Sequence, residues 1–322
     1  MTVIRQLFSR DFSLFAIAIA SAAFAQSTLD STFNNFLSAT FAMSDFERGI
    51  LELPRELPGL LVIFVSALLA FLCPRHLAVT ANVLTGLGMF LIGFFSSSFD
   101  IMLVWLFIAS VGQHLFFPLQ SSIAMELAPE GHTGRVLGKL QAWGNIAGLA
   151  GSLVVWGGFR LAGFDFKTSF VIGGLGYLSA AVMIAMMQRD TPQPAASRFR
   201  LRREYGLYYW LTVLYGTRKQ LFLTFAPWVL VTVFHEPTET IAILLFIGGV
   251  IGIFFKPWLG HLIDRRGERF VFTAEASLLI LICLGYAFAN DLFAPRAALA
   301  VTAGCYIIDQ LLVSAGMARA TW

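Results

Sequence analysis

The stretch IMLVWLFIASVGQHLFFPLQ, residues 101–120, contains twenty residues without a single Asp, Glu, Lys or Arg. An α-helix needs about 20 mostly apolar residues to cross the hydrocarbon core of a bilayer. Because lipid offers no partner to an unpaired backbone group, a run of this kind must be helical. The stretch therefore predicts a transmembrane helix.

The composition of the whole chain supports the same environment. Hydrophobic residues make up 57% of the 322 residues and charged residues 13%, and the mean hydropathy is +0.76. A soluble chain carries about a quarter charged residues, and a disordered chain needs low hydrophobicity, so both classes are excluded. The net charge of +3 gives no support to a nucleic-acid partner. The spacing of Cys73, Cys283 and Cys305 indicates neither a disulfide framework nor a metal site, and we predict no cofactor.

Ten apolar runs of spanning length follow one another along the chain. They lie at residues 12–37, 49–72, 77–97, 101–127, 136–159, 166–187, 208–234, 241–260, 270–289 and 296–318. A polar stretch rich in arginine separates the sixth run from the seventh. We therefore predict an all-α membrane protein with a six-helix N-terminal bundle (1–187), a basic cytoplasmic linker (188–207) and a four-helix C-terminal bundle (208–322).

Basic residues set the predicted orientation, because cytoplasmic loops carry an excess of Lys and Arg. With the N-terminus inside, most of the 22 Lys and Arg residues fall on the inner side. The outer loops then hold only Arg48, Arg160, Lys167 and Arg296. We predict two cytoplasmic termini and a bacterial inner membrane. Residues 5–25 also resemble a cleavable signal peptide, but the apolar character continues to Phe41, which favours an uncleaved first span.

The loop after the eighth run reads GHLIDRRGER, residues 260–269. It resembles the G-x-x-x-D-R-x-G-R-[RK] loop of the major facilitator superfamily of secondary transporters, with Glu268 in place of one arginine. The matching positions, which we take as a gating loop, are Gly260, Asp264, Arg265, Gly267 and Arg269. The resemblance implies a fold of two helical bundles, transport by alternating access and no enzymatic activity.

The chain also departs from the pattern of that superfamily. The equivalent loop of the first half, LCPRH at residues 72–76, has no acidic residue and no glycine. The fifth run has glycines at 144, 148 and 151 but no Gly-Pro pair, which puts an antiporter in doubt. The superfamily usually has twelve spans, so ten indicate a chain truncated after the tenth helix, or a fragment.

Polar side chains recur in four of the predicted spans. A charge at mid-bilayer costs roughly 2.5–3.5 kcal/mol, so such residues should face a partner or a wet cavity. In the superfamily, spans 1, 4, 7 and 10 line the central cavity. The residues that we predict to bind the substrate there are Gln26, Asp30, Asn34, Gln113, His114, Arg218, Lys219, Asp309 and Gln310.

A carboxyl group or an imidazole inside the bilayer can also take up the proton that drives transport. The candidates for proton coupling are Asp30, Glu52, Glu56 and His114. Each has a structural alternative, because Asp30 can pair with Arg55, the two glutamates can neutralise that arginine, and His114 can be a packing residue. Likewise, Asp309 can be the partner of Arg218 or Lys219, and Glu275 can bind the gating loop.

These features predict a secondary active transporter that moves a small polar or anionic solute by alternating access. Proton-coupled symport is the expected mechanism, membrane lipid is the expected surrounding, and we expect a monomer. The alternative is a non-transporting remnant of the family. A membrane enzyme has less support, because the sequence shows no nucleophile elbow, phosphate loop or metal-spaced histidines.

Overall fold

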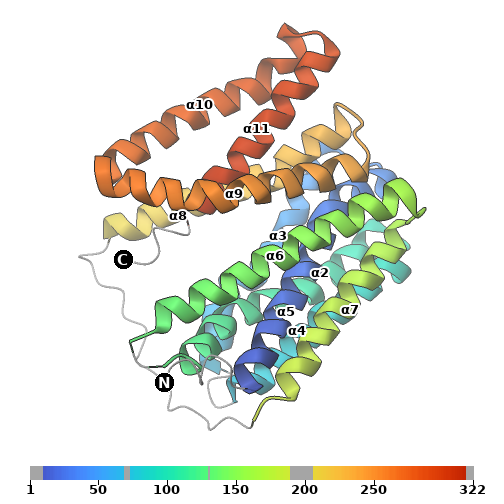
Figure 1. The fold of residues 1–322 in the computed structure, drawn as a ribbon. Coiled ribbons are helices and arrows are strands. Elements are labelled where there is room, and N and C mark those ends of the chain that lie inside the picture. Colours follow the sequence, from blue (N-terminus) through green and yellow to red (C-terminus); the bar gives the residue numbers. More distant parts are fainter. Residues whose placement is uncertain (1–9, 69–72, 130, 189–205, 317–322) are drawn as a thin grey trace. The chain divides into compact units, whose positions relative to one another are not determined.

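The computed structural model describes residues 10–68, 73–129, 131–188 and 206–316. These residues form ten α-helices and no strand (Figure 1). The helices are α2 (Arg10–Phe41), α3 (Asp45–Leu68), α4 (Pro74–Phe95), α5 (Phe99–Glu126), α6 (Thr133–Leu161), α7 (Phe166–Ala185), α8 (Gly206–Thr232), α9 (Thr238–Arg266), α10 (Glu268–Leu292) and α11 (Pro295–Gly316).

Each of the ten predicted spans coincides with one of these helices, which confirms the all-α membrane fold. The largest difference lies at α9, which continues to Arg266 where we expected an end near residue 260. Seven of the described helices are long and apolar enough to cross a membrane by their own sequence. The others, α3, α6 and α8, carry more polar residues or shorter apolar stretches within their length.

The chain divides into two compact units, Met1–Phe199 and Arg200–Trp322, which we call unit 1 and unit 2. The boundary falls in the predicted basic linker, of which residues 189–205 lie outside the described residues. Helices α2–α7 belong to unit 1 and helices α8–α11 to unit 2.

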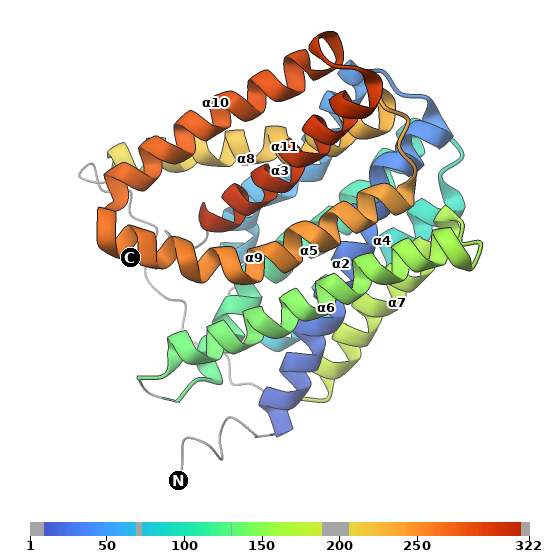
Figure 2. The same cartoon turned by 45° about the horizontal axis from the view of Figure 1, so that its top comes forward.

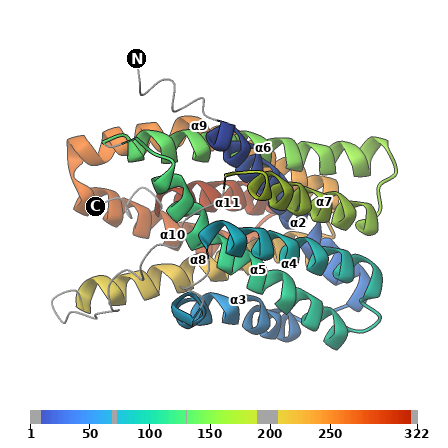
Figure 3. The same cartoon turned by 90° about the horizontal axis from the view of Figure 1, so that it is seen from below.

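In unit 1, helix α7 packs against both α2 and α4. Helix α2 also packs against α6, and α5 packs against α4 and α3, as Figure 3 shows from below. Glycines allow some of these backbones to approach closely. A Cβ atom at Gly112 of α5 would collide with the carbonyl oxygen of Ala81 in α4, and one at Gly151 of α6 would lie 2.6 Å from the carbonyl oxygen of Phe24 in α2.

The start of α7 is fixed by Asp165, which precedes the helix. Its Oδ1 accepts a hydrogen bond of 2.8 Å from the backbone N–H of Thr168 and one of 2.6 Å from the hydroxyl of that residue. This cap satisfies one of the free N–H groups of the first turn. The same hydrogen bonds lower the pKa of the Asp165 carboxyl below its usual value.

In unit 2, α11 packs against α9, α10 and α8. An apolar cluster that includes Leu230, Ile241 and Tyr306 joins α8, α9 and α11. Helices α9 and α10 are separated by Gly267 alone, and the chain turns sharply there (Figure 2). The φ angle of Gly267 is +79°, a conformation that residues with a side chain rarely adopt.

Candidate functional site

Gln26 of α2 holds the most connected polar network of unit 1. Its Nε2 donates a hydrogen bond of 2.9 Å to Oδ1 of Asp30. Its Oε1 accepts one of 2.9 Å from Nε2 of Gln113 in α5 and one of 2.7 Å from the hydroxyl of Tyr177 in α7. Asp30 is exposed although it lies on a membrane-spanning helix. The network therefore joins three helices and ends on an accessible carboxyl group.

Arg48 is a buried residue of α3, so our assignment of this arginine to an outer loop is wrong. Its side chain is 0% exposed, and its Nη1 lies 2.5 Å from Oε1 of Glu52. Its Nε donates a hydrogen bond of 3.2 Å to Oδ1 of Asn34. A buried charge needs such partners, because desolvation costs several kcal/mol. Asn34 is itself buried, and this contact ties it to the interface of α2 and α3.

Arg55 pairs with glutamates of its own helix. Its Nη1 lies 3.2 Å from Oε1 of Glu52, and its Nε lies 3.9 Å from Oε1 of Glu56. Arg55 also attracts Asp30 electrostatically, although the two side chains form no ion pair within 4.0 Å in the described residues. Positions three residues apart already face each other on a helix, and Glu52 therefore meets Arg55 without any rearrangement.

His114 of α5 is held between two polar groups. Its Nε2 lies 3.3 Å from Oε2 of Glu56 in α3, and its Nδ1 lies 3.0 Å from Oγ of Ser110. A Cβ atom at Gly59 would lie 2.7 Å from the His114 ring, so α3 and α5 meet closely here. The contact agrees with a packing role for His114, and it brings the imidazole ring next to the Glu56 carboxyl group.

In unit 2, Arg218 of α8 forms an ion pair with Asp309 of α11. Nη2 of the arginine lies 2.6 Å from Oδ1 of Asp309, and the two side chains are 16% and 3% exposed. This confirms the pairing that we gave as the structural alternative. The guanidinium carbon also lies 5.4 Å from the centre of the Phe222 ring. The Nε and Nη1 atoms of Arg218 are buried and have no hydrogen-bond partner within the described part of the chain.

The other two predicted residues of unit 2 lie in different surroundings. Lys219 is half-buried on α8. Gln310 meets α9, because a Cβ atom at Gly248 would collide with its Oε1. The Nε2 atom of Gln310 is buried and lacks a hydrogen-bond partner among the described residues. Arg218 and Gln310 thus both have buried hydrogen-bond donors without a partner in the described residues.

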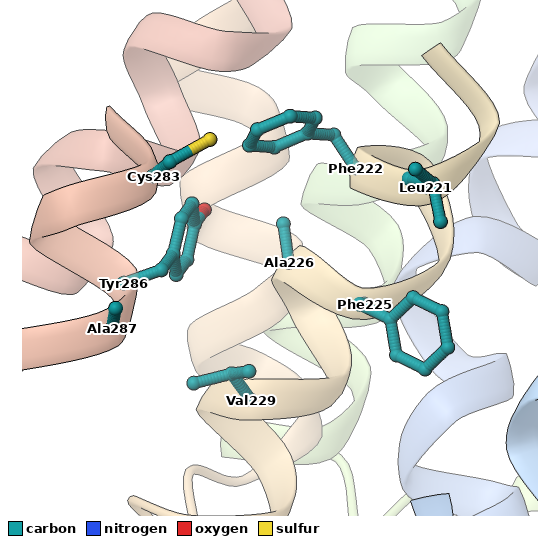
Figure 4. A pocket seen from close by; sticks show the side chains of 8 residues that line it. All are labelled: Leu221, Phe222, Phe225, Ala226, Val229, Cys283, Tyr286 and Ala287. Carbon is teal, nitrogen blue, oxygen red and sulfur yellow. The ribbon is translucent and has the colours of Figure 1, made fainter. Parts of the chain in front are cut away.

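An apolar groove of about 340 Å³ lies between α8 and α10. Figure 4 shows the residues that line it: Leu221, Phe222, Phe225, Ala226, Val229, Cys283, Tyr286 and Ala287. The rings of Phe222 and Tyr286 lie 6.1 Å apart, and the Tyr286 hydroxyl is buried without a hydrogen-bond partner in the part of the chain that is described. This lining suits hydrocarbon better than a polar solute.

Comparison with known proteins places this arrangement in a family. The family model described as Major Facilitator Superfamily matches residues 9–321. The chain belongs to the major facilitator superfamily. No curated protein gives a significant match to the chain.

Solved structures of the superfamily share this fold. The D323A mutant of the nucleoside transporter NupG has a TM-score of 0.77 at 13% identity, with 95% of this chain and 80% of that chain covered. A bacterial homologue of the human lysosomal transporter Spinster, inward-facing and occupied, has a TM-score of 0.68 at 18% identity, with 95% and 73% covered. A D-xylose-proton symporter has a TM-score of 0.63 at 16% identity, with 95% and 80% covered.

The superfamily loop at residues 260–269 spans the end of α9 and the start of α10. Gly267 provides the sharp turn between the two helices. A Cβ atom at Gly260 would meet no atom within 4 Å in the described residues, so this glycine does not mark a close helix contact there. Arg265 and Arg269 are exposed, whereas the side chain of Asp264 lies outside the described residues.

Three parts of this superfamily member escaped the sequence analysis: the Tyr177 hydroxyl, the buried Arg48 and a cluster around Arg75. Nη2 of Arg75 lies 2.7 Å from Oε1 of Glu126, its Nη1 lies 3.4 Å from Oδ2 of Asp11, and its Nη1 also donates to the carbonyl oxygen of Gln188. Arg75 lies in the first turn of α4, within the stretch at residues 72–76 that has no acidic residue. Its acidic partners lie at the start of α2 and at the end of α5, far from Arg75 in the sequence.

Proposed function

We propose that this protein is a secondary active transporter that moves a small polar or anionic solute by alternating access, coupled to protons. The observation that carries the proposal is the Gln26 network, which holds an exposed carboxyl group on a membrane-spanning helix. Ionisable groups at such depth are costly, and they are typical of substrate and proton pathways. Membership of a transporter superfamily supports the same reading.

The proposed roles follow from the contacts of each residue. Asp30 is the leading proton-coupling group, because its recorded hydrogen bond comes from a neutral amide. Glu52 lies between Arg48 and Arg55 and serves mainly to neutralise them. Glu56 and His114 form a second proton-carrying pair.

In unit 2, Arg218 is the proposed anion-binding residue. Asp309 neutralises one side of its guanidinium group, while the buried Nε and Nη1 atoms have no hydrogen-bond partner in the described residues and would bind an anionic or polar solute once the site opens. Gln310 adds a further donor, and Lys219 a second positive charge. The loop at residues 260–269 is proposed to gate the inner side.

The names of the structural relatives support a polar solute without selecting one. They mention a nucleoside transporter, a D-xylose-proton symporter and a transporter crystallised with a peptide conjugate.

We further propose a monomer in a bacterial inner membrane with both termini in the cytoplasm. A membrane-impermeant thiol reagent should then label Cys73 from the cytoplasmic side only, with Arg160→Cys as the control for the outer side.

Uptake by proteoliposomes tests the transport proposal. The probes are uridine, D-xylose, a dipeptide and succinate, each with and without an inward proton gradient. The gradient should raise accumulation of at least one probe, and Asp30→Asn should abolish that increase. Equal accumulation with and without the gradient would show that proton coupling is wrong. Flux that survives both Arg218→Ala and Lys219→Ala would remove the preference for an anion.

The second candidate is a non-transporting member of the superfamily. The groove between α8 and α10 favours it, because an apolar opening in unit 2 would admit lipid to the bundle. In that case none of the four probes would accumulate, although the purified chain would still unfold cooperatively in detergent.

A further inference from the structure

The orientation of the Gln26 amide follows from the chemistry of its neighbours. An ionised carboxylate only accepts hydrogen bonds, so the atom of Gln26 that faces ionised Asp30 must be Nε2. The Oε1 atom then faces Gln113 and Tyr177, which both donate to it. Two donors on one oxygen hold the amide in the orientation that serves an ionised Asp30.

We propose that Gln26, Gln113 and Tyr177 form a hydrogen-bond chain whose polarity reverses when Asp30 takes up a proton, with Tyr177 as the positioning residue. The proposal rests on the proposed role of Asp30 in proton coupling. Protonated Asp30 becomes a donor, and the Gln26 amide turns so that Oε1 accepts from it. Nε2 of Gln26 then donates toward the Tyr177 hydroxyl and the Gln113 amide, each of which has an acceptor oxygen. The carboxyl group gains one proton, and no covalent bond of the chain is broken.

The chain reaches two helices beyond the one that carries Asp30. Gln113 lies on α5 and Tyr177 on α7, and the Tyr177 side chain is buried. A change of charge on α2 is therefore passed to α5 and α7 as a change of hydrogen-bond direction, without any need for a large movement. Linked hydrogen bonds of this kind act as a unit in a medium of low dielectric constant.

Few other charged or titratable groups act on Asp30. Arg55 contributes its positive charge from α3, and Tyr177 is the titratable neighbour from α7. Gln113 of α5 is neutral. On α6, the glycines at positions 144, 148 and 151 lie against the part of α2 that precedes Asp30. Arg55 stays charged throughout, so the hydrogen-bond chain is the part that responds to the proton.

Infrared difference spectroscopy of the full chain in lipid, recorded as a pH titration, tests the proposal without any solute. The carboxylic acid band of Asp30 is identified by its loss in Asp30→Asn. We expect a Gln side-chain amide band to change in step with it. Tyr177→Phe removes one donor that holds Gln26 in place, so half-protonation of Asp30 should move to higher pH by roughly half a unit to one unit.

Two variants make the test specific. Tyr286→Phe removes a buried hydroxyl from unit 2 and should leave the titration unchanged. In a Gln26→Leu background, Tyr177→Phe should have no further effect, because the link is already broken. The proposal is overturned if Tyr177→Phe leaves the midpoint unchanged, or if its shift persists without Gln26. A failure of transport with an intact spectroscopic response would instead count against the proposed function alone.

Discussion

In unit 1, α2 and α4 both pack against α7, whereas in unit 2 the corresponding helices α8 and α10 line a groove of about 340 Å³. We match the helices of the two units by their order along the chain and by the helices that they pack against. The fourth helix of each unit, α5 or α11, packs against the second and the third helix of that unit. Helices α2 and α4 thus share α7 as a neighbour, whereas α8 and α10 share α11 within the described residues.

Both units hold buried polar side-chain atoms without a hydrogen-bond partner in the described residues, such as Oδ1 of Asn82 and Oγ of Ser169 in unit 1. In unit 1, α7 supplies the Tyr177 hydroxyl that completes the Gln26 network. In unit 2, the Tyr286 hydroxyl, Nε2 of Gln310 and two nitrogens of Arg218 are buried without a hydrogen-bond partner in the described part. A buried polar group that lacks a partner costs about 1–3 kcal/mol. The comparison teaches that a transmembrane helix of this fold contributes hydrogen-bond partners as well as apolar packing.

The largest effect is expected at the fully buried arginine of unit 1. Arg48→Ala leaves Glu52 with one partner fewer and empties a buried site, so the free energy of unfolding should fall by about 3–5 kcal/mol. Thermal unfolding of the purified chain in detergent measures the loss. Arg160→Ala, at an exposed arginine of the same unit, is the control and should change stability by less than about 0.5 kcal/mol. Equal effects of the two variants would contradict the burial of Arg48.

The second largest effect concerns helix packing, which is closer at Gly112 of unit 1 than at Gly252 of unit 2. A Cβ atom at Gly112 of unit 1 would meet backbone atoms of α4, whereas one at Gly252 of unit 2 would lie 3.8 Å from Cδ2 of Leu311, an ordinary contact. Gly112→Ala should therefore destabilise the chain by about 1–3 kcal/mol. Gly252→Ala should be neutral or slightly stabilising, because alanine favours the helix. Detergent melts of both variants test this, and a larger loss for Gly252→Ala would reverse the comparison.

The start of α7 gives a smaller effect that depends on pH. Asp165→Ala removes the helix cap and should cost about 1 kcal/mol at neutral pH. Because the pKa of Asp165 is lowered in the folded state, its contribution is present above the ordinary carboxyl pKa and is lost as pH falls through the lower folded value. The gap between wild type and Asp165→Ala should thus close below about pH 4. Urea unfolding at several pH values measures it, and Asp165→Asn, which keeps a capping side chain, should show less pH dependence.

Hydropathy predicted the ten helices because lipid requires every long apolar run to satisfy its own backbone. The partners of the polar residues were harder to predict. The pairing of Arg218 with Asp309 was one of the alternatives that the sequence offered, since few other charges lie in the spans of unit 2. The burial of Arg48 was not predicted, because this arginine precedes the apolar run of α3, although its side chain is hydrogen-bonded to Asn34 of α2. The hydrogen bond from Tyr177 to Gln26 was not predicted, because an aromatic residue in an apolar run does not indicate which group its hydroxyl binds.

The smallest effect compares two tyrosine hydroxyls, one in each unit. Tyr177→Phe removes a hydrogen bond of 2.7 Å to Gln26 and should lower the free energy of unfolding by about 0.5–1.5 kcal/mol. Tyr286→Phe removes a hydroxyl that has no hydrogen-bond partner in the described residues, so its loss should be neutral or slightly stabilising. The two variants have the same change in volume, and their difference in thermal unfolding therefore isolates the hydrogen bond. An equal loss in both would mean that the Tyr286 hydroxyl is bonded in the membrane, by a group that completes unit 2 in the way that α7 completes unit 1.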